Sequence, residues 1–180
     1  VIPIAGDQIT NDIAIAFRTS TQDAESIKLD YGVALQQMAD ADEMLEVPGV
    51  GDRPSTKLSR QPLAGVIQPR VEEIFQKVHE EMVRSGYEKL LRAGIVLTGG
   101  ASAMPGMTQL GEEIFHNTVK LGVPTYDGNL RDVVRNPRYS TAMGLLQEGM
   151  LQRKRGLKVR GTNSFGQILS RMRDWFGKNF

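Results

Sequence analysis

The chain has 180 residues, of which 40% are apolar, with a net charge of +1 and no cysteine. This length and apolar content suffice for a folded core, and the lack of cysteine excludes disulfides and thiolate metal sites. The two histidines, His79 and His116, lack the spacing of metal ligands, so we expect no metal site. No apolar run approaches the roughly 20 residues of a membrane span, and the start does not resemble a signal peptide. We therefore expect neither a membrane span nor export.

Charge is distributed unevenly along the chain. Residues 153–180 contain eight of the 22 basic residues and one of the 21 acidic residues, which gives +7 for this segment and −6 for the rest. A basic tail on a mildly acidic body predicts an anionic partner for the tail. The sequence begins with Val1, inside an expected strand, and we interpret it as a fragment.

The first expected elements are a strand and two helices. The strand covers residues 1–6, and Thr10 or Asn11 is expected to cap a helix over residues 12–18. The segment Thr19-Ser20-Thr21 is expected to cap a second helix.

The second helix carries an ion pair at helical spacing and is expected to end at Gly32. Glu25 and Lys28 are three residues apart, so their side chains share one face of the helix. From the residues alone, the plain interpretation is a surface ion pair that contributes little to stability.

Residues 38–58 and 63–91 have different periodicities. In residues 38–58, apolar and polar residues alternate loosely around the turn segment PGVGDRP, which predicts short antiparallel strands. Residues 63–91 have a helical period that is interrupted by Pro69 and again near Gly86, which predicts two helices or one kinked helix. Arg60 and Arg70 bracket the first part of this helix, where a solvated face accounts for both.

The stretch AGIVLTGGASAMPG, residues 93–106, combines a strand, a turn and the start of a helix. Residues 94–97 are apolar and rich in β-branched side chains, which predicts a strand buried on both faces. The following Gly99-Gly100 pair allows positive φ and close approach of another backbone or a flat ligand ring. A plain tight turn and a nucleotide site at the end of a buried strand are equally good interpretations. Neither a Walker A motif nor G-x-G-x-x-G occurs, so no phosphate loop is predicted.

An edge strand, a helix and a linker are expected next. Residues 121–126 predict an edge strand, because Pro124 lacks the N–H that a central strand needs. A last body helix is expected over residues 139–150, after the break at Asn136-Pro137. Residues 151–163 are charged, contain glycine and have little to bury, which predicts a flexible linker.

The terminal segment, residues 164–180, has the strongest local pattern. At about 100° per residue its apolar side chains fall within an arc of roughly 140°, opposite a polar face. The apolar residues are Phe165, Ile168, Leu169, Met172, Trp175, Phe176 and Phe180, and the basic residues are Arg171, Arg173 and Lys178. This pattern is typical of a helix that lies in a membrane interface. Docking on the chain's own core and binding in a calmodulin-like groove are the alternatives.

Several segments, in order, resemble one protein family. They are IPIAGDQITNDIA, DAESIKLDYGVAL, RQPLAGVIQPR, AGIVLTGGASAMPGM, YSTAMGLL and RMRDWFGKNF. Together they resemble the carboxyl-terminal half of the FtsA family of bacterial cell-division proteins, in the actin and heat-shock-chaperone ATPase superfamily. The resemblance implies an α/β fold: the carboxyl-terminal part of an actin-like (ribonuclease-H-like) ATPase domain, with a flexible linker and a C-terminal amphipathic helix.

The resemblance also implies a division into subdomains. Residues 1–20 and 93–150 correspond to an incomplete nucleotide-binding subdomain, and residues 21–92 to an inserted small subdomain that binds FtsZ. Residues 151–163 correspond to the linker and residues 164–180 to the membrane-targeting helix.

An ATP site is a further implication of the resemblance. By analogy, Gly6 and the turn Gly99-Gly100-Ala101 lie against the adenosine, while Glu25 and Lys28 address ribose and adenine. Where chaperone relatives carry an arginine that stacks on adenine, this chain has Ala103, which implies a more loosely held base. The family's phosphate loops and amino-terminal domain are missing from this sequence. We therefore expect no catalytic residues and no metal site here, and at most slow Mg-ATP hydrolysis in a full-length parent.

The function implied by the resemblance is that of an actin-like adaptor. Such a protein polymerises and anchors the FtsZ ring to the cytoplasmic face of the bacterial membrane at the division septum. Its partners are the FtsZ carboxyl-terminal peptide, further copies of itself, anionic lipid and other division proteins, without nucleic acid. The FtsZ peptide is acidic, so Arg60 and Arg70 are the candidate contacts. An ATP-using enzyme of the same superfamily, such as a sugar kinase, is the alternative, although a kinase has no use for a linker and an amphipathic helix.

Overall fold

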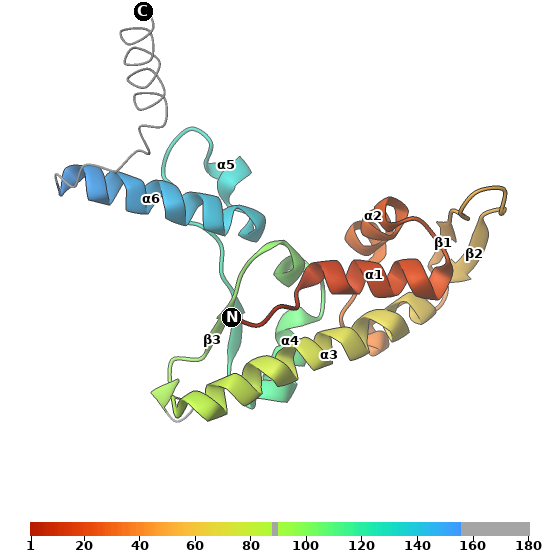
Figure 1. Cartoon of the computed structure of the whole chain (residues 1–180), viewed down its shortest axis with the longest axis horizontal. Coiled ribbons are helices and arrows are strands. Elements are labelled where there is room, and N and C mark those ends of the chain that lie inside the picture. The colour runs from red at the N-terminus through yellow and green to blue at the C-terminus, as the bar shows by residue number, and fades with distance from the viewer. Residues whose placement is uncertain (88–89, 156–180) are drawn as a thin grey trace, which may run out of the picture. The chain divides into compact units, whose positions relative to one another are not determined.

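A computed structural model describes residues 1–87 and 90–155 of the chain (Figure 1). The chain divides into two units, Val1–Thr141 and Ala142–Phe180. The helices of the first unit are α1 (Gly6–Phe17), α2 (Thr21–Tyr31), η1 (Gln36–Met38), α3 (Arg60–Ser85), η3 (Gly100–Ala103), α4 (Met107–Phe115), α5 (Arg131–Val134) and η4 (Pro137–Tyr139). Its strands are β1 (Met44–Val47), β2 (Thr56–Ser59), β3 (Ile95–Leu97) and β4 (Val119–Leu121). The helix α6 (Ser140–Lys154) begins at the end of the first unit and continues into the second.

The described strands form two small sheets. The strands β1 and β2 pair antiparallel, with Met44 opposite Ser59, which confirms the antiparallel strands predicted for residues 38–58. The strands β3 and β4 pair in parallel, with Ile95 opposite Val119, and α4 connects them. A parallel pair needs such a crossover connection, because the chain must return to the same end of the sheet.

The prediction of a strand at residues 1–6 is wrong. Within the described residues, strands pair only as β1 with β2 and β3 with β4, so the backbone of residues 1–5 has no ladder partner. Helix α1 begins at Gly6, earlier than predicted. The negative charge of Asp7 in its first turn stabilises the positive, N-terminal end of the helix dipole. The prediction for α2 is confirmed, since Ser20 accepts a hydrogen bond from the backbone N–H of Asp23 at 3.1 Å and Gly32 caps the other end.

The helical pattern of residues 63–91 corresponds to one helix, α3, which begins at Arg60 and contains Pro69. Pro62 lies in the first turn of this helix, where the N–H groups have no helical partner and proline is tolerated. The helix ends at Ser85, followed by Gly86 in the left-handed conformation, as expected near that glycine.

Strand β3 is not buried on both faces as predicted. Its residues Ile95 and Leu97 pack against the core, but Val96 between them is 67% exposed. Side chains alternate between the faces of a strand, so only one face of β3 is covered within the first unit. Its partner β4 lies at Val119–Leu121, earlier than the predicted edge strand, and ends before Pro124.

In the second unit, α6 extends through Lys154. The first residues of the predicted linker, 151–154, are therefore helical, and Gln152 donates a hydrogen bond to Glu148 at 3.0 Å on the same helix face. Leucine, glutamine, lysine and arginine are good helix formers, so this charged segment extends the helix. The linker residues 156–163 lie outside the described residues. Among those described, no helix is long and apolar enough to cross a bilayer.

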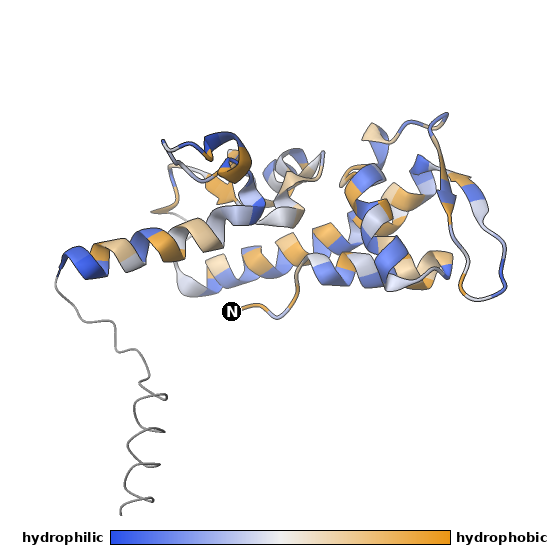
Figure 2. Cartoon of the chain, turned by 90° about the horizontal axis from the view of Figure 1, so that it is seen from above, coloured by the Kyte–Doolittle hydropathy of each residue, from blue (hydrophilic) through white to orange (hydrophobic). Residues whose placement is uncertain are grey.

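The core of the first unit lies along α3. This helix contributes Leu63, Ile67, Val71 and Phe75, which recur every four residues and form one buried face. Figure 2 shows the resulting alternation of apolar and polar segments along the helices. Side chains from α1, α2, β1, α4 and β4 join the same cluster. The proposed subdomains therefore share one apolar core, and their boundaries stay predictions.

Truncation of Ile67 to alanine is expected to lower the free energy of unfolding by about 2–5 kcal/mol, because a buried side chain leaves a cavity. Ile67 is 0% exposed. The control Val83→Ala, on the exposed end of the same helix, should change the free energy by less than about 1 kcal/mol. Urea unfolding followed by circular dichroism measures both, and equal losses would contradict the core position of Ile67.

Candidate functional site

A cleft of about 660 Å³ lies among segments that are far apart in the sequence of the first unit. The residues predicted from the resemblance to contact nucleotide all line it: Gly6, Glu25, Lys28, Gly99, Gly100 and Ala101. The other lining residues are Ala5, Asp7, Leu29, Gly32, Thr98, Ala103, Met104, Pro105, Asn136 and Arg138. The start of α1, one side of α2, the loop after β3 and the segment at η4 thus converge on one space.

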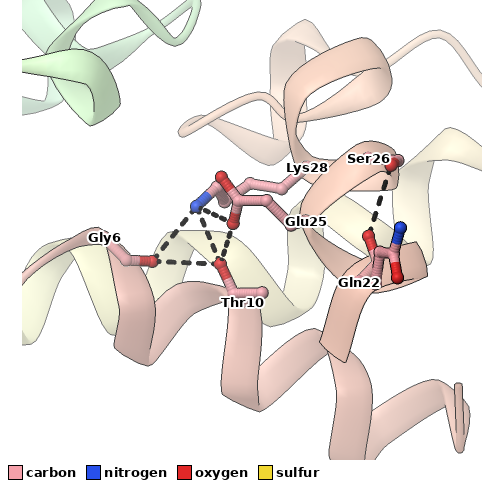
Figure 3. A network of polar contacts seen from close by, with 6 residues as sticks. All are labelled: Gly6, Thr10, Gln22, Glu25, Ser26 and Lys28. Atoms are coloured by element: carbon pink, nitrogen blue, oxygen red, sulfur yellow. Dashed lines mark hydrogen bonds and ion pairs between the residues drawn. The ribbon is translucent and has the colours of Figure 1, made fainter. Parts of the chain in front are cut away.

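A polar network that includes the lining residues Gly6, Glu25 and Lys28 joins α1 to α2 (Figure 3). The ammonium group of Lys28 donates to Glu25 Oε2 at 2.6 Å, to Thr10 Oγ1 at 2.7 Å and to the carbonyl oxygen of Gly6 at 3.3 Å. The Thr10 hydroxyl also contacts Glu25 Oε2. Lys28 is only 6% exposed. The interpretation of this pair as a surface ion pair is therefore wrong, because the network turns the lysine inward, away from bulk water.

The network also affects the charge of Glu25. Burial by itself raises the pKa of a carboxyl group, but hydrogen bonds from Lys28 and Thr10 and the positive charge of Lys28 oppose it. The result is a pKa of Glu25 below its ordinary value. At neutral pH Glu25 is a carboxylate, which can only accept hydrogen bonds.

Hydrogen bonds fix the backbone of the glycine turn after β3. Gly99 has φ = 98°, a conformation that favours glycine. Its N–H donates to the carbonyl of Pro137 at 3.2 Å, and its own carbonyl accepts from Ser102 Oγ at 2.7 Å. A Cβ on Gly100 would meet only Arg138 Cβ, at 3.8 Å. The turn is thus fixed by hydrogen bonds, and the space beside Gly100 is open.

The sequence interpretation missed three residues of this site. The prediction of Thr10 as a helix cap is wrong, because Thr10 lies inside α1, and its hydroxyl contacts both Glu25 and Lys28. Asn136 and Arg138 line the cleft through η4, and the Arg138 guanidinium lies 5.9 Å from the ring of Tyr139. The Asn136-Pro137 break was visible in the sequence, but nothing there indicated that η4 returns to the glycine turn.

Arg60 and Arg70 do not line the cleft. Arg60 donates to the carbonyl of Tyr31 at 2.8 Å and pairs with Glu43 at 2.6 Å. Arg70 pairs with Asp12 of α1.

Arg70 is also in an ion pair with Glu73 and is 25% exposed. Its hydrogen bond to Asp12 raises its pKa above the ordinary arginine value, against the effect of burial, and the charges of Asp12 and Glu73 add to the rise. Both candidate partner-binding arginines therefore already have acidic partners inside the chain.

The predicted membrane-binding residues, from Phe165 to Phe180, lie outside the described residues. Within the described part of the chain, no group of three histidine, aspartate or glutamate side chains is placed to hold a metal ion.

Comparison with known proteins assigns the chain to a family. A family model described as cell division protein FtsA matches residues 1–144. The chain belongs to the FtsA family. The FtsA protein of Pseudomonas aeruginosa is 52% identical over the whole chain, and that of Escherichia coli is 42% identical over the same span. The chain covers 45% of each of these proteins, so it spans about half the length of these FtsA relatives.

The FtsA relative of Bacillus subtilis is 42% identical over 82% of this chain and 32% of its own length. Two solved structures share the fold of this FtsA-family chain. MreB5 of Spiroplasma citri bound to ADP has a TM-score of 0.55 and 17% sequence identity, and the same protein bound to AMPPNP has a TM-score of 0.58 and 16% identity. Each match covers 82% of this chain and 47% of the other. These similarities confirm the predicted α/β, actin-like fold.

Proposed function

We propose that this FtsA-family chain supplies the nucleoside half of an ATP site in a cell-division adaptor. The observation that carries the proposal is the convergence of the predicted nucleotide contacts on one cleft. Its volume, about 660 Å³, is within the range of about 300–1,000 Å³ typical of small-molecule sites. One protein of the same fold, MreB5 of Spiroplasma citri, was solved with ADP and with AMPPNP, which supports a nucleotide as the ligand.

The residues of the cleft fit the adenosine part of ATP. Glu25 is 43% exposed, and its carboxylate is suited to accept a hydrogen bond from a sugar hydroxyl. Gly6 and Ala101 lie close together in the cleft lining, since a Cβ on Gly6 would be 3.1 Å from the Ala101 Cβ, so a larger side chain at position 6 would not fit there. The phosphates and Mg²⁺ are assigned to residues outside this chain, because no phosphate loop occurs in its sequence.

Calorimetric titration with Mg-ATP tests the proposal. A full-length FtsA-family protein that carries residues 1–180 as its carboxyl-terminal part should bind ATP, whereas this chain alone should bind it weakly. The reason is that the sequence contains no phosphate loop for the charged part of the ligand. Absence of ATP binding in the full-length protein would reject the proposal.

We further propose that the whole protein polymerises, binds the FtsZ carboxyl-terminal peptide and attaches to anionic lipid on the cytoplasmic face of the membrane at the septum. The basic amphipathic pattern of residues 164–180 supports the lipid part. A kinase-like enzyme of the same superfamily is the alternative, and FtsA membership favours the adaptor. ATP would then serve as a switch for polymerisation, with slow hydrolysis at most.

Arg70 allows a test of the peptide site with a matched control. Reversal to glutamate would place a third carboxylate beside Asp12 and Glu73 and disturb the fold, so Arg70→Met is the better variant. If Arg70 contacts an acidic FtsZ peptide, this variant should weaken binding about tenfold, the typical effect of losing one hydrogen bond to a charged group.

The control is Asp12→Asn, which disrupts the same internal ion pair but keeps the guanidinium. Fluorescence anisotropy with labelled peptide should show near-normal affinity for this control. Equal loss in both variants would indicate that Arg70 acts only by joining α1 to α3.

A further inference from the structure

Two basic residues, Lys28 and Arg138, are among the described residues that line the cleft. A lysine ammonium has three N–H donors, and those of Lys28 are directed to Glu25, Thr10 and the carbonyl of Gly6. Arg138 differs, because its side chain is exposed and its guanidinium has no acidic partner within residues 1–87 and 90–155. Of the two basic side chains, that of Arg138 therefore remains available to a ligand.

The backbone of Arg138 is fixed beside the glycine turn. Its N–H donates to Asn136 Oδ1 at 3.1 Å, and the carbonyl of the buried Pro137 accepts from the Gly99 N–H at 3.2 Å. The Cβ of Arg138 would lie 3.8 Å from a Cβ placed on Gly100. The arginine side chain thus starts at the glycine turn, while its guanidinium is not held by a hydrogen bond within the described part of the chain.

The part of the cleft wall that the glycine turn forms has no side chain larger than a methyl group. Its lining residues are Gly99, Gly100, Ala101 and Ala103. A flat ligand ring can approach such a wall at contact distance. The guanidinium of Arg138 extends several bonds beyond its Cβ and can therefore reach over a ring that lies against this wall.

The shape of the arginine head group suits this position. A guanidinium is planar and stacks on aromatic rings, with an electrostatic attraction to the face of the ring. In this chain the guanidinium carbon of Arg138 already lies 5.9 Å from the centre of the Tyr139 ring. A planar group has two faces, so this contact leaves one face for a ligand.

We propose that the guanidinium of Arg138 stacks on the base of the bound nucleotide and holds that base against the glycine turn. The inference rests on the proposed nucleotide site and deepens it by naming a residue that binds the base. The phosphates are assigned to residues outside this chain, so the base is the part of the ligand that lies nearest to Gly100 and Arg138. The planar shape of the side chain should then matter more for affinity than its charge.

Displacement of a fluorescent ATP analogue from a full-length FtsA-family protein that carries this chain measures the affinities for ATP and for adenosine. Arg138→Met removes the planar cation and keeps an unbranched stem, so it should weaken both ligands by the same factor, about fivefold. Arg138→Tyr supplies an uncharged planar ring, which can also stack on a base, and should keep both affinities near those of the unmodified protein.

The alternative is a contact between Arg138 and the phosphates. A loss confined to ATP in Arg138→Met, with adenosine unaffected, would identify that contact and overturn the proposal. Equal losses of ATP affinity in Arg138→Met and Arg138→Tyr would identify charge as the cause and overturn it as well. Unchanged ATP affinity in Arg138→Met would show that Arg138 is a solvated surface residue.

Arg135→Met is the matched control, because Arg135 is also exposed but does not line the cleft. It changes the net charge by the same amount and should leave both affinities and the unfolding midpoint unchanged. A loss as large as that of Arg138→Met would attribute the effect to net charge and overturn the proposal. Failure of the unmodified protein to bind either ligand would instead reject the proposed nucleotide site itself.

Discussion

Gly100→Val is expected to reduce ATP binding by a full-length FtsA-family protein carrying this chain by about a hundredfold or more, while the fold stays intact. A Cβ at position 100 meets only Arg138 Cβ at 3.8 Å, which is ordinary van der Waals contact. The added methyl groups therefore extend into the cleft, where they take space that the nucleoside needs. Overlap of this kind cannot be relieved without displacement of the turn, which is held by hydrogen bonds to Pro137 and Ser102.

Gly99→Val is the matched comparison on the same turn. Gly99 has φ = 98°, which is strained for a residue with a side chain, so this variant should lower the unfolding midpoint as well as ATP affinity. Gly100→Val should keep the midpoint of the unmodified protein. Calorimetry and thermal unfolding separate the two effects. Unmodified ATP affinity in Gly100→Val would show that the turn has only a structural role.

Removal of residues 164–180 is expected to abolish binding to anionic vesicles. Each apolar side chain removed from water contributes about 1.5–3 kcal/mol to the free energy of membrane binding, and each basic residue near an anionic leaflet contributes about 1 kcal/mol. The loss of conformational entropy when the segment becomes ordered opposes binding by a similar total. A single tail should therefore bind weakly and reversibly. An array of tails along a filament would bind through its effective concentration, so attachment would follow polymerisation.

Trp175 supplies the measurement for this tail, whose residues lie outside those that the structure describes. Anionic vesicles should shift its fluorescence to shorter wavelength and increase helical circular dichroism, and salt should weaken both changes. Trp175→Glu and Phe176→Glu should reduce the binding. Equal vesicle binding by residues 1–163 and by the whole chain would exclude the tail as the anchor.

The sequence by itself determined those features of this FtsA-family chain that depend on near neighbours. The cap Ser20 and the terminator Gly32 define α2, because capping involves residues within one turn. The four-residue spacing from Leu63 to Phe75 identifies the buried face of α3. The strand and glycine turn of residues 95–100 follow from β-branched residues and from the backbone freedom of glycine.

The tertiary structure alone decided which distant residues meet. Whether residues 1–5 or Val96 lie in a covered strand depends on neighbours that local patterns do not specify. In the same way, the spacing of Glu25 and Lys28 is that of an ordinary surface pair. Only the packing of α1 against α2 brings Thr10 to Lys28 and buries the ammonium group. Local patterns reflect the free energy of forming single helices and strands. The free energy of burying a charge depends instead on partners that the fold brings together from separate segments.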